Sequence, residues 1–153
     1  MELRLLKGIK RGPYVEFNIS GSESDYAHRA DTSLFLDEAV FGLFAERFEA
    51  CVEDFNYYGP TRYTSSDLSK LREELEADAA GWNQIADSNG FIAAMCTGRI
   101  LGNNFLSELE SQAYDLKIDW SRVLDLLKQV NIDLIVLIDQ CIREGRTLWV
   151  LGI

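Results

Sequence analysis

The most regular pattern of apolar and polar positions lies in residues 119–153. Apolar side chains recur there at spacings of three and four, as on one face of an α-helix: Val123, Leu127, Val130, Leu134, Leu137 and Cys141. Further isoleucines widen this face, so we expect a mostly buried helix that starts near Asp119 or Ser121 and ends at Gly145. The β-branched and aromatic residues that follow predict a buried strand over 146–152.

Two stretches at the start of the chain alternate apolar and polar residues with the period of a β-strand. They cover residues 2–9 and 13–20, and residues 10–13 between them have the composition of a turn. The apolar stretch 146–152 has no other obvious partner. We therefore expect it to pair with this N-terminal arm.

The pattern from about residue 31 to residue 55 predicts a long amphipathic helix. At 100° per residue, four acidic side chains fall together on the side opposite the apolar face: Glu38, Glu46, Glu49 and Glu53. Like charges at this spacing destabilise a helix by about 0.2–0.5 kcal/mol per pair. A helix face that carries only negative charge lowers the stability of the fold, and such a feature indicates a role in function.

A segment rich in tyrosine follows at residues 56–63, and it contains Tyr57, Tyr58, Arg62 and Tyr63. Tyrosine and arginine are enriched among the residues that dominate protein–protein binding energies. The segment is therefore a candidate recognition loop. The alternative is that Tyr57 and Tyr58 are partly buried core at the edge of the sheet.

A second amphipathic helix is predicted with Ser65 or Ser66 as its N-cap, and it extends to about residue 87. Its inward positions are apolar, namely Leu68, Leu71, Leu75 and Trp82. Its outward positions are mostly acidic, namely Glu73, Glu74, Glu76 and Asp78. The two predicted helices thus share one sign of charge on their outer faces.

Residues 87–118 give the least regular pattern, with a turn at 87–90, a short helix or strand at 91–96 and a short helix around 105–113. Together the elements predict an α+β fold, a mostly helical single domain with a small sheet formed by the N-terminal strands and the C-terminal strand. The predicted core comprises Leu5, Phe17, Val40, Phe44, Phe48, Leu71, Leu75, Leu124, Leu127, Leu134, Leu137 and Trp149.

Net charge changes this picture more than any other bulk property. The 153 residues include 15 basic and 25 acidic side chains, which gives a net charge of −10. Direct nucleic-acid binding needs clustered lysine and arginine, so this balance argues against it and favours a basic protein partner. Solubility alone is the other explanation of the acidic charge.

Membrane and secretion signals are not apparent, because no apolar run approaches the ~20 residues that span a bilayer. We expect a cytoplasmic protein. Its three cysteines, Cys51, Cys96 and Cys141, are an odd number with apolar neighbours, and we expect reduced, buried, unligated thiols.

Motifs for catalysis or cofactor binding are missing from the sequence. It contains no P-loop, dinucleotide-binding or nucleophile-elbow motif, and the cysteines are too far apart for a zinc site. The single histidine, His28, stands in a polar segment without a nearby nucleophile motif. We assign no catalytic residue, no metal ligand and no cofactor.

The acidic helices, the tyrosine-rich segment and the closing sequence from Glu144 to Ile153 together resemble the small immunity proteins that bacteria make against polymorphic or contact-dependent toxins. The resemblance spans the chain but is one of general character. It implies a protein without catalytic activity that binds one cognate toxin, often a basic nuclease, and blocks its active site or substrate groove.

The resulting hypothesis is an inhibitor that docks its acidic helical side and tyrosine segment on a basic toxin. The residues expected to contact that partner are Glu38, Glu46, Glu49, Glu53, Tyr57, Tyr58, Arg62, Tyr63, Glu73, Glu74 and Asp78. The alternatives are a small enzyme or ligand-binding domain with its site in residues 87–118, and a structural subunit of a larger assembly.

Overall fold

The computed structural model of the protein describes residues 1–8, 12–22, 24–96 and 100–152, without the side chains of residues 100–103. Within these residues, five strands form one antiparallel sheet in the order β1-β3-β2-β5-β4. The strands are β1 (Leu6–Lys7), β2 (Tyr14–Asn18), β3 (Leu34–Asp37), β4 (Pro60–Tyr63) and β5 (Leu148–Leu151).

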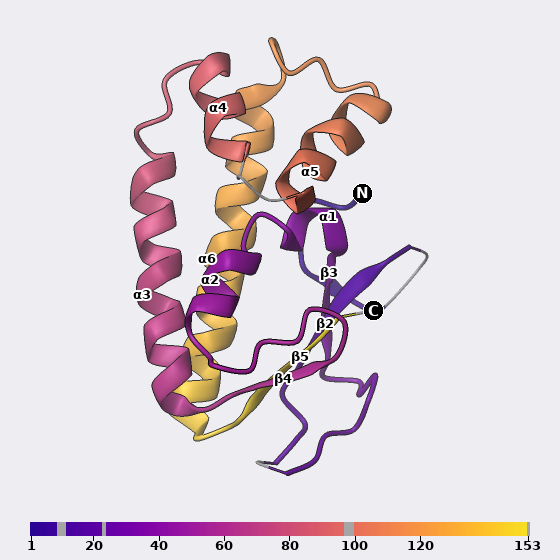
Figure 1. Ribbon diagram of the computed structural model, residues 1–153, viewed down its shortest axis with the longest axis vertical. Helices are drawn as coiled ribbons and strands as arrows, with labels where there is room; N and C mark the ends of the chain where they lie inside the picture. Colours follow the sequence, from indigo (N-terminus) through magenta and orange to yellow (C-terminus); the bar gives the residue numbers. More distant parts are fainter. Residues whose placement is uncertain (9–11, 23, 97–99, 153) are drawn as a thin grey trace.

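Helices cover one face of this sheet (Figure 1). They are α1 (Glu38–Phe41), α2 (Ala45–Ala50), α3 (Ser65–Trp82), α4 (Ser88–Met95), α5 (Ile100–Ser111) and α6 (Trp120–Glu144). The long helices α3 and α6 pack side by side along the long axis of the molecule. Helix accounts for 49% of the chain and strand for 13%, which confirms the predicted α+β class with more helix than strand.

The predicted pairing of the C-terminal strand with the N-terminal arm is confirmed. β5 lies antiparallel to β2, with Val150 opposite Phe17, and its other edge pairs with β4. The two N-terminal strands do not neighbour each other, however, because β3 lies between β1 and β2.

The single helix predicted over residues 31–55 is wrong. The chain there forms β3 and then the two short helices α1 and α2. β3 is buried on both faces, since Leu36 faces the helices while Phe35 packs with Leu6 and Tyr14 on the other side. A strand buried on both faces gives a continuous apolar run, which periodicity does not distinguish from a buried helix. Asp37 then starts α1 by accepting a hydrogen bond from the backbone N–H of Ala39 at 3.0 Å.

Part of the tyrosine-rich segment is also a strand rather than a loop. In β4, Thr61 and Tyr63 are buried, and the Tyr63 hydroxyl donates a hydrogen bond to the carbonyl of Phe48 at 2.9 Å. The N-cap of the following helix, α3, lies one residue before Ser65, the earlier of the two predicted caps, and the helix ends at Trp82 and not near residue 87. Its N-cap is Thr64, whose backbone N–H donates to the Asp67 carboxylate at 2.9 Å.

α6 confirms the strongest prediction from the sequence. It ends at Gly145, which has φ 63° in the left-handed region, as expected for a helix C-terminus. Residues 88–95 and 100–111, for which the sequence left helix and strand open in part, are helical. None of the helices in the described ranges is both long and apolar enough to cross a membrane.

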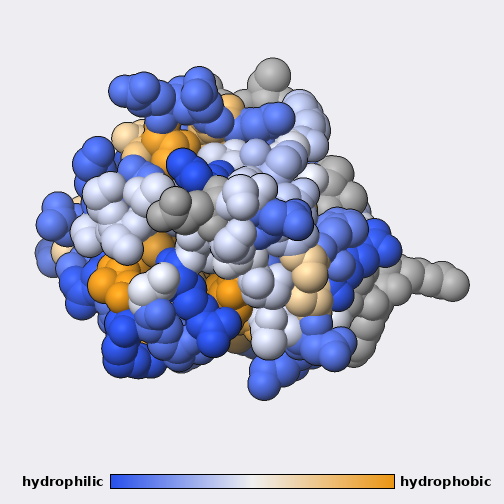
Figure 2. All heavy atoms as spheres, turned by 90° about the horizontal axis from the view of Figure 1, so that it is seen from below, coloured by the Kyte–Doolittle hydropathy of each residue, from blue (hydrophilic) through white to orange (hydrophobic). Residues whose placement is uncertain are grey.

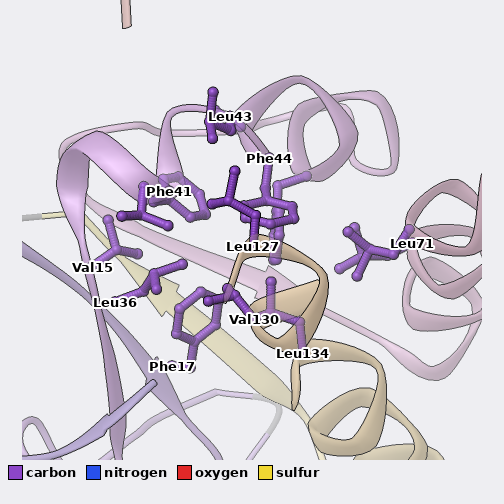
Figure 3. Packing of buried hydrophobic residues seen from close by; sticks show 14 of the residues in the cluster. Val15, Phe17, Leu36, Phe41, Leu43, Phe44, Leu71, Leu127, Val130 and Leu134 are labelled. Carbon is purple, nitrogen blue, oxygen red and sulfur yellow. The ribbon is translucent and has the colours of Figure 1, made fainter. Parts of the chain in front are cut away.

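The core lies between the helices and the covered face of the sheet. Figure 3 shows Val15, Phe17 and Leu36 from the sheet near Phe41 and Leu127 from the helices. Ten of the predicted core residues are buried, and the exceptions are Leu5 and Trp149, which are partly exposed.

Trp149 is partly exposed because side chains alternate between the two faces of its strand. Leu148 and Val150 point into the core, so Trp149 lies on the outer face of the sheet. Its ring packs against Tyr26 at a centroid distance of 5.0 Å, and its indole N–H donates to the carbonyl of Ser22 at 3.0 Å.

Substitution of Leu137 tests the buried face of α6. Leu137 is 4% exposed, whereas its neighbour Val136 is 60% exposed on the same helix. Leu137→Ala should lower the free energy of unfolding by about 2–5 kcal/mol, because it removes buried methyl groups and leaves a cavity. Val136→Ala should change it little. Urea denaturation measures both, and equal effects of the two substitutions would contradict the assigned orientation of α6.

The cysteines differ in exposure, which corrects the expectation of three buried thiols. Cys51 and Cys141 are buried and Cys96 is exposed, and all three are free. Burial raises the pKa of the Cys51 and Cys141 thiols to about 11 in each case.

Thiol reactivity should follow this difference. At mildly alkaline pH a disulfide reagent should react quickly with Cys96 alone in the native protein, because only the thiolate is the nucleophile. All three thiols should react after denaturation without reductant. Two thiols missing from the denatured count would instead reveal a disulfide, and three fast native thiols would contradict the burial of Cys51 and Cys141.

Candidate protein-binding surface

A series of aromatic contacts leads from the core to the surface and ends in Tyr58. Ring centroids lie 5.1 Å apart for Phe48 and Phe41, 6.1 Å for Phe41 and Tyr57, and 5.1 Å for Tyr57 and Tyr58. Tyr58 is 78% exposed. Each ring is thus supported by the one beneath it, although the last one projects into solvent.

The loop at residues 52–59, which carries Tyr58, is anchored at several points. The backbone N–H of Tyr58 donates to the Asn56 side-chain oxygen at 3.1 Å, and the backbone N–H of Asn56 donates to Thr61 Oγ1 at 2.9 Å. The backbone of Tyr57 also passes so close to Gly152 that a side chain at Gly152 would collide with it. Contacts of this kind fix the loop before any partner binds, which lowers the entropy cost of binding.

Carboxylates lie along and beneath this loop. Glu53 and Asp54 are exposed and form no salt bridge within the residues that the structure describes. Glu38 is partly buried and faces the Tyr57 hydroxyl, although the two make no hydrogen bond of good geometry. Burial, and after it the charge of Glu38, raises the pKa of Tyr57. Asp54 is not among the contact residues predicted from the sequence, because the pattern there predicts a helix, although its position next to Glu53 was the available signal.

The four glutamates predicted to share one helical face do not share one. Glu38 begins α1, Glu46 and Glu49 lie on α2, and Glu53 follows the end of α2. Glu46 and Glu49 are partly buried and each has an interaction within the fold. Of the four glutamates, only Glu38 and Glu53 lie at the loop of residues 52–59.

The carboxylates on α3 also separate into different roles. Asp78 accepts hydrogen bonds from Arg47 Nη2 at 2.8 Å and Arg47 Nε at 3.0 Å, and Glu74 lies 4.0 Å from the same guanidinium. The pKa of Arg47 is raised by this hydrogen bond to Asp78. Asp78 and Glu74 therefore join α3 to α2, while Glu73 is exposed.

Two further predicted contact residues lie on β4. Tyr63 is 0% exposed, so its side chain belongs to the core and is not part of the candidate surface. Arg62 is exposed and lies opposite Trp149 in the pairing of β4 with β5. Arg62 also has an interaction within the fold.

A cavity of about 410 Å³ lies between α1 and α5, and Glu38 lines it. Its other acidic residues are Asp37 and Glu108, with Ser107 and Asn104 nearby. Burial is the main cause of the raised pKa of Asp37. Residues 104–111 therefore contribute polar side chains to a cavity whose other lining residues come from the first 39 residues of the chain.

The described residues hold no group of three His, Cys, Asp or Glu side chains placed to bind a metal ion. His28 lies on the far side of the sheet, with Nδ1 at 3.0 Å from Glu16. No family model, curated protein or solved structure matches this chain.

Neutralising Asp78 tests whether this carboxylate serves the fold. Asp78→Asn should lower the free energy of unfolding by about 1–2 kcal/mol, because Arg47 loses its ionised acceptor at a partly buried site. Glu73→Gln, at an exposed position of the same helix, is the matched control and should change it by less than about 0.5 kcal/mol. Denaturant titration measures both, and equal effects would show that the Arg47–Asp78 contact adds nothing to stability.

Proposed function

We propose that the protein is a non-catalytic inhibitor that binds a basic protein through the loop at residues 52–59. The observation that carries this proposal is Tyr58, which is 78% exposed on an anchored backbone beside acidic side chains. A large exposed aromatic ring costs solubility, and fixed tyrosines are efficient contact residues. The class of inhibitor proposed is the bacterial immunity protein that neutralises a cognate toxin in the cytoplasm.

Charge would control how the partner arrives. A net charge of −10 attracts a basic protein over a distance, and Glu53 and Asp54 place part of that charge beside Tyr58. On contact, Tyr58 would supply desolvated area, while the partly exposed Glu38 offers a carboxylate to a lysine or arginine. A basic nuclease fits this description, because its substrate groove must be positively charged.

The cavity between α1 and α5 supports a second candidate, the binding of a small cationic molecule. Three carboxylates line it, from Asp37, Glu38 and Glu108. Under this alternative a small polyamine would raise the melting temperature, and Glu108→Gln would remove that effect. Under the inhibitor proposal Glu108→Gln leaves capture of the partner unchanged.

Affinity capture with charge-matched baits tests the inhibitor proposal. The baits are the wild-type protein, a loop variant with Glu53→Lys and Asp54→Lys, and a control with Glu110→Lys and Asp125→Lys. The control has the same net charge, but its substitutions lie on α5 and α6. A basic protein should be retained by the wild type and the control and lost by the loop variant.

Association kinetics with the purified partner then separate the two contributions. The loop variant should associate at least about tenfold more slowly at low salt, with a flatter salt dependence, because it has lost electrostatic steering. Tyr58→Ala should mainly speed dissociation. An acidic partner, or a partner that the loop variant binds as fast as the control does, would overturn the proposal.

A further inference from the structure

The segment between β2 and β3 is held against the outer face of the sheet by one buried carboxylate. The Glu16 side chain is 1% exposed. Its Oε1 accepts hydrogen bonds from the Ser33 hydroxyl at 2.7 Å, the backbone N–H of Arg29 at 2.9 Å and the side-chain amide of Asn18 at 2.9 Å. Its Oε2 lies 3.0 Å from His28 Nδ1.

Arg29 has a backbone conformation that requires such support. Its φ of 54° lies in the left-handed region, which costs a residue with a side chain roughly 1–2 kcal/mol. The hydrogen bond from its backbone N–H to Glu16 helps to offset this cost. Glu16 is thus a positioning residue for Arg29, and strain of this kind commonly marks functional sites.

Arg29 lines a pocket of about 410 Å³ on this side of the sheet. Lys7 from β1 lines the same pocket, together with Ser33, Phe35 and one carboxylate, Asp31. Lys7 and Arg29 are both exposed, and neither forms a salt bridge within the described residues. The pocket thus has two cationic side chains and one carboxylate among its described lining residues, although the whole chain carries a net charge of −10.

This end of the molecule is mainly hydrophilic at its surface. Figure 2 views it from the end at which the segment between β2 and β3 lies in Figure 1, and only small hydrophobic patches appear between the hydrophilic residues. A pocket with charged side chains at a mainly hydrophilic end of the molecule suits a small charged ligand better than an apolar protein partner.

We propose that this pocket binds a small molecule that carries a phosphate group, with Lys7 and Arg29 as the residues that contact the phosphate. A guanidinium can donate two parallel hydrogen bonds to phosphate oxygens, and a lysine ammonium supplies a second positive charge. The pocket volume suits a phosphate monoester of a small metabolite. Asp31 can accept a hydrogen bond from a hydroxyl of the organic part, and its negative charge opposes a ligand of high anionic charge.

Titration followed by NMR of backbone amides tests this assignment, with glycerol 3-phosphate as the probe. Saturable shifts should concentrate at Gly8, Ala30 and Ser33, which line the pocket. Glycerol and acetate at matched ionic strength should not produce them. Each of Lys7→Gln and Arg29→Gln should weaken binding at least about tenfold, because each removes a charged phosphate contact.

Lys70→Gln on α3 is the matched control and should bind the probe like the wild type. Should Arg29→Gln lower the melting temperature, Lys7→Gln, on a different element, still decides the result. Shifts that acetate reproduces, shifts that follow ionic strength alone, or affinities unchanged in Lys7→Gln would each overturn the assignment. None of these outcomes bears on the 52–59 loop, so the proposed function stands or falls separately.

Discussion

β5 lies between β2 and β4, and among the described residues β4 has no other strand as a neighbour. Val150 faces Phe17 on one side and Thr61 on the other, so one short strand joins segments from the start, the middle and the end of the chain. The helices pack on the face that these strands create. The loop at residues 52–59 is anchored where its backbone contacts Gly152, just after β5. The candidate binding surface therefore depends on the same pairing as the core.

The spacing of apolar residues predicted the helices that bury one side and expose the other. α6 and α3 each bury one side and expose the other, so their apolar residues recur with the helical period, and both helices were found. β3 was missed because Phe35 and Leu36 are buried on opposite faces, which erases the alternation that marks a strand. Trp149 was placed in the core because hydrophobicity reports burial in general and not which side of a strand is covered.

The charged residues of the site were harder to predict, since a sequence does not show which charges neutralise each other. Asp78 and Glu73 look alike on an acidic helix, but Arg47, 31 residues before Asp78, pairs with only one of them. Likewise, Tyr58 and Tyr63 occur in one tyrosine-rich segment, and only the path of β4 separates an exposed ring from a buried one. The buried carboxylate of Glu16 follows the same rule, because all of its partners except Asn18 lie in a segment without periodic pattern.

The position of β5 in the chain has a consequence for biosynthesis. β2 and β4 lack a common partner until residues 148–151 have left the ribosome. The sheet therefore stays incomplete while most of the preceding residues are already outside the ribosome. Contacts between residues more than a hundred positions apart form slowly, and unpaired strand edges favour aggregation in the meantime. α3 can form early from local contacts, but the loop at residues 52–59 gains its contact with Gly152 only when β5 docks. A nascent chain would therefore present the candidate binding surface only after β5 has been synthesised and has docked.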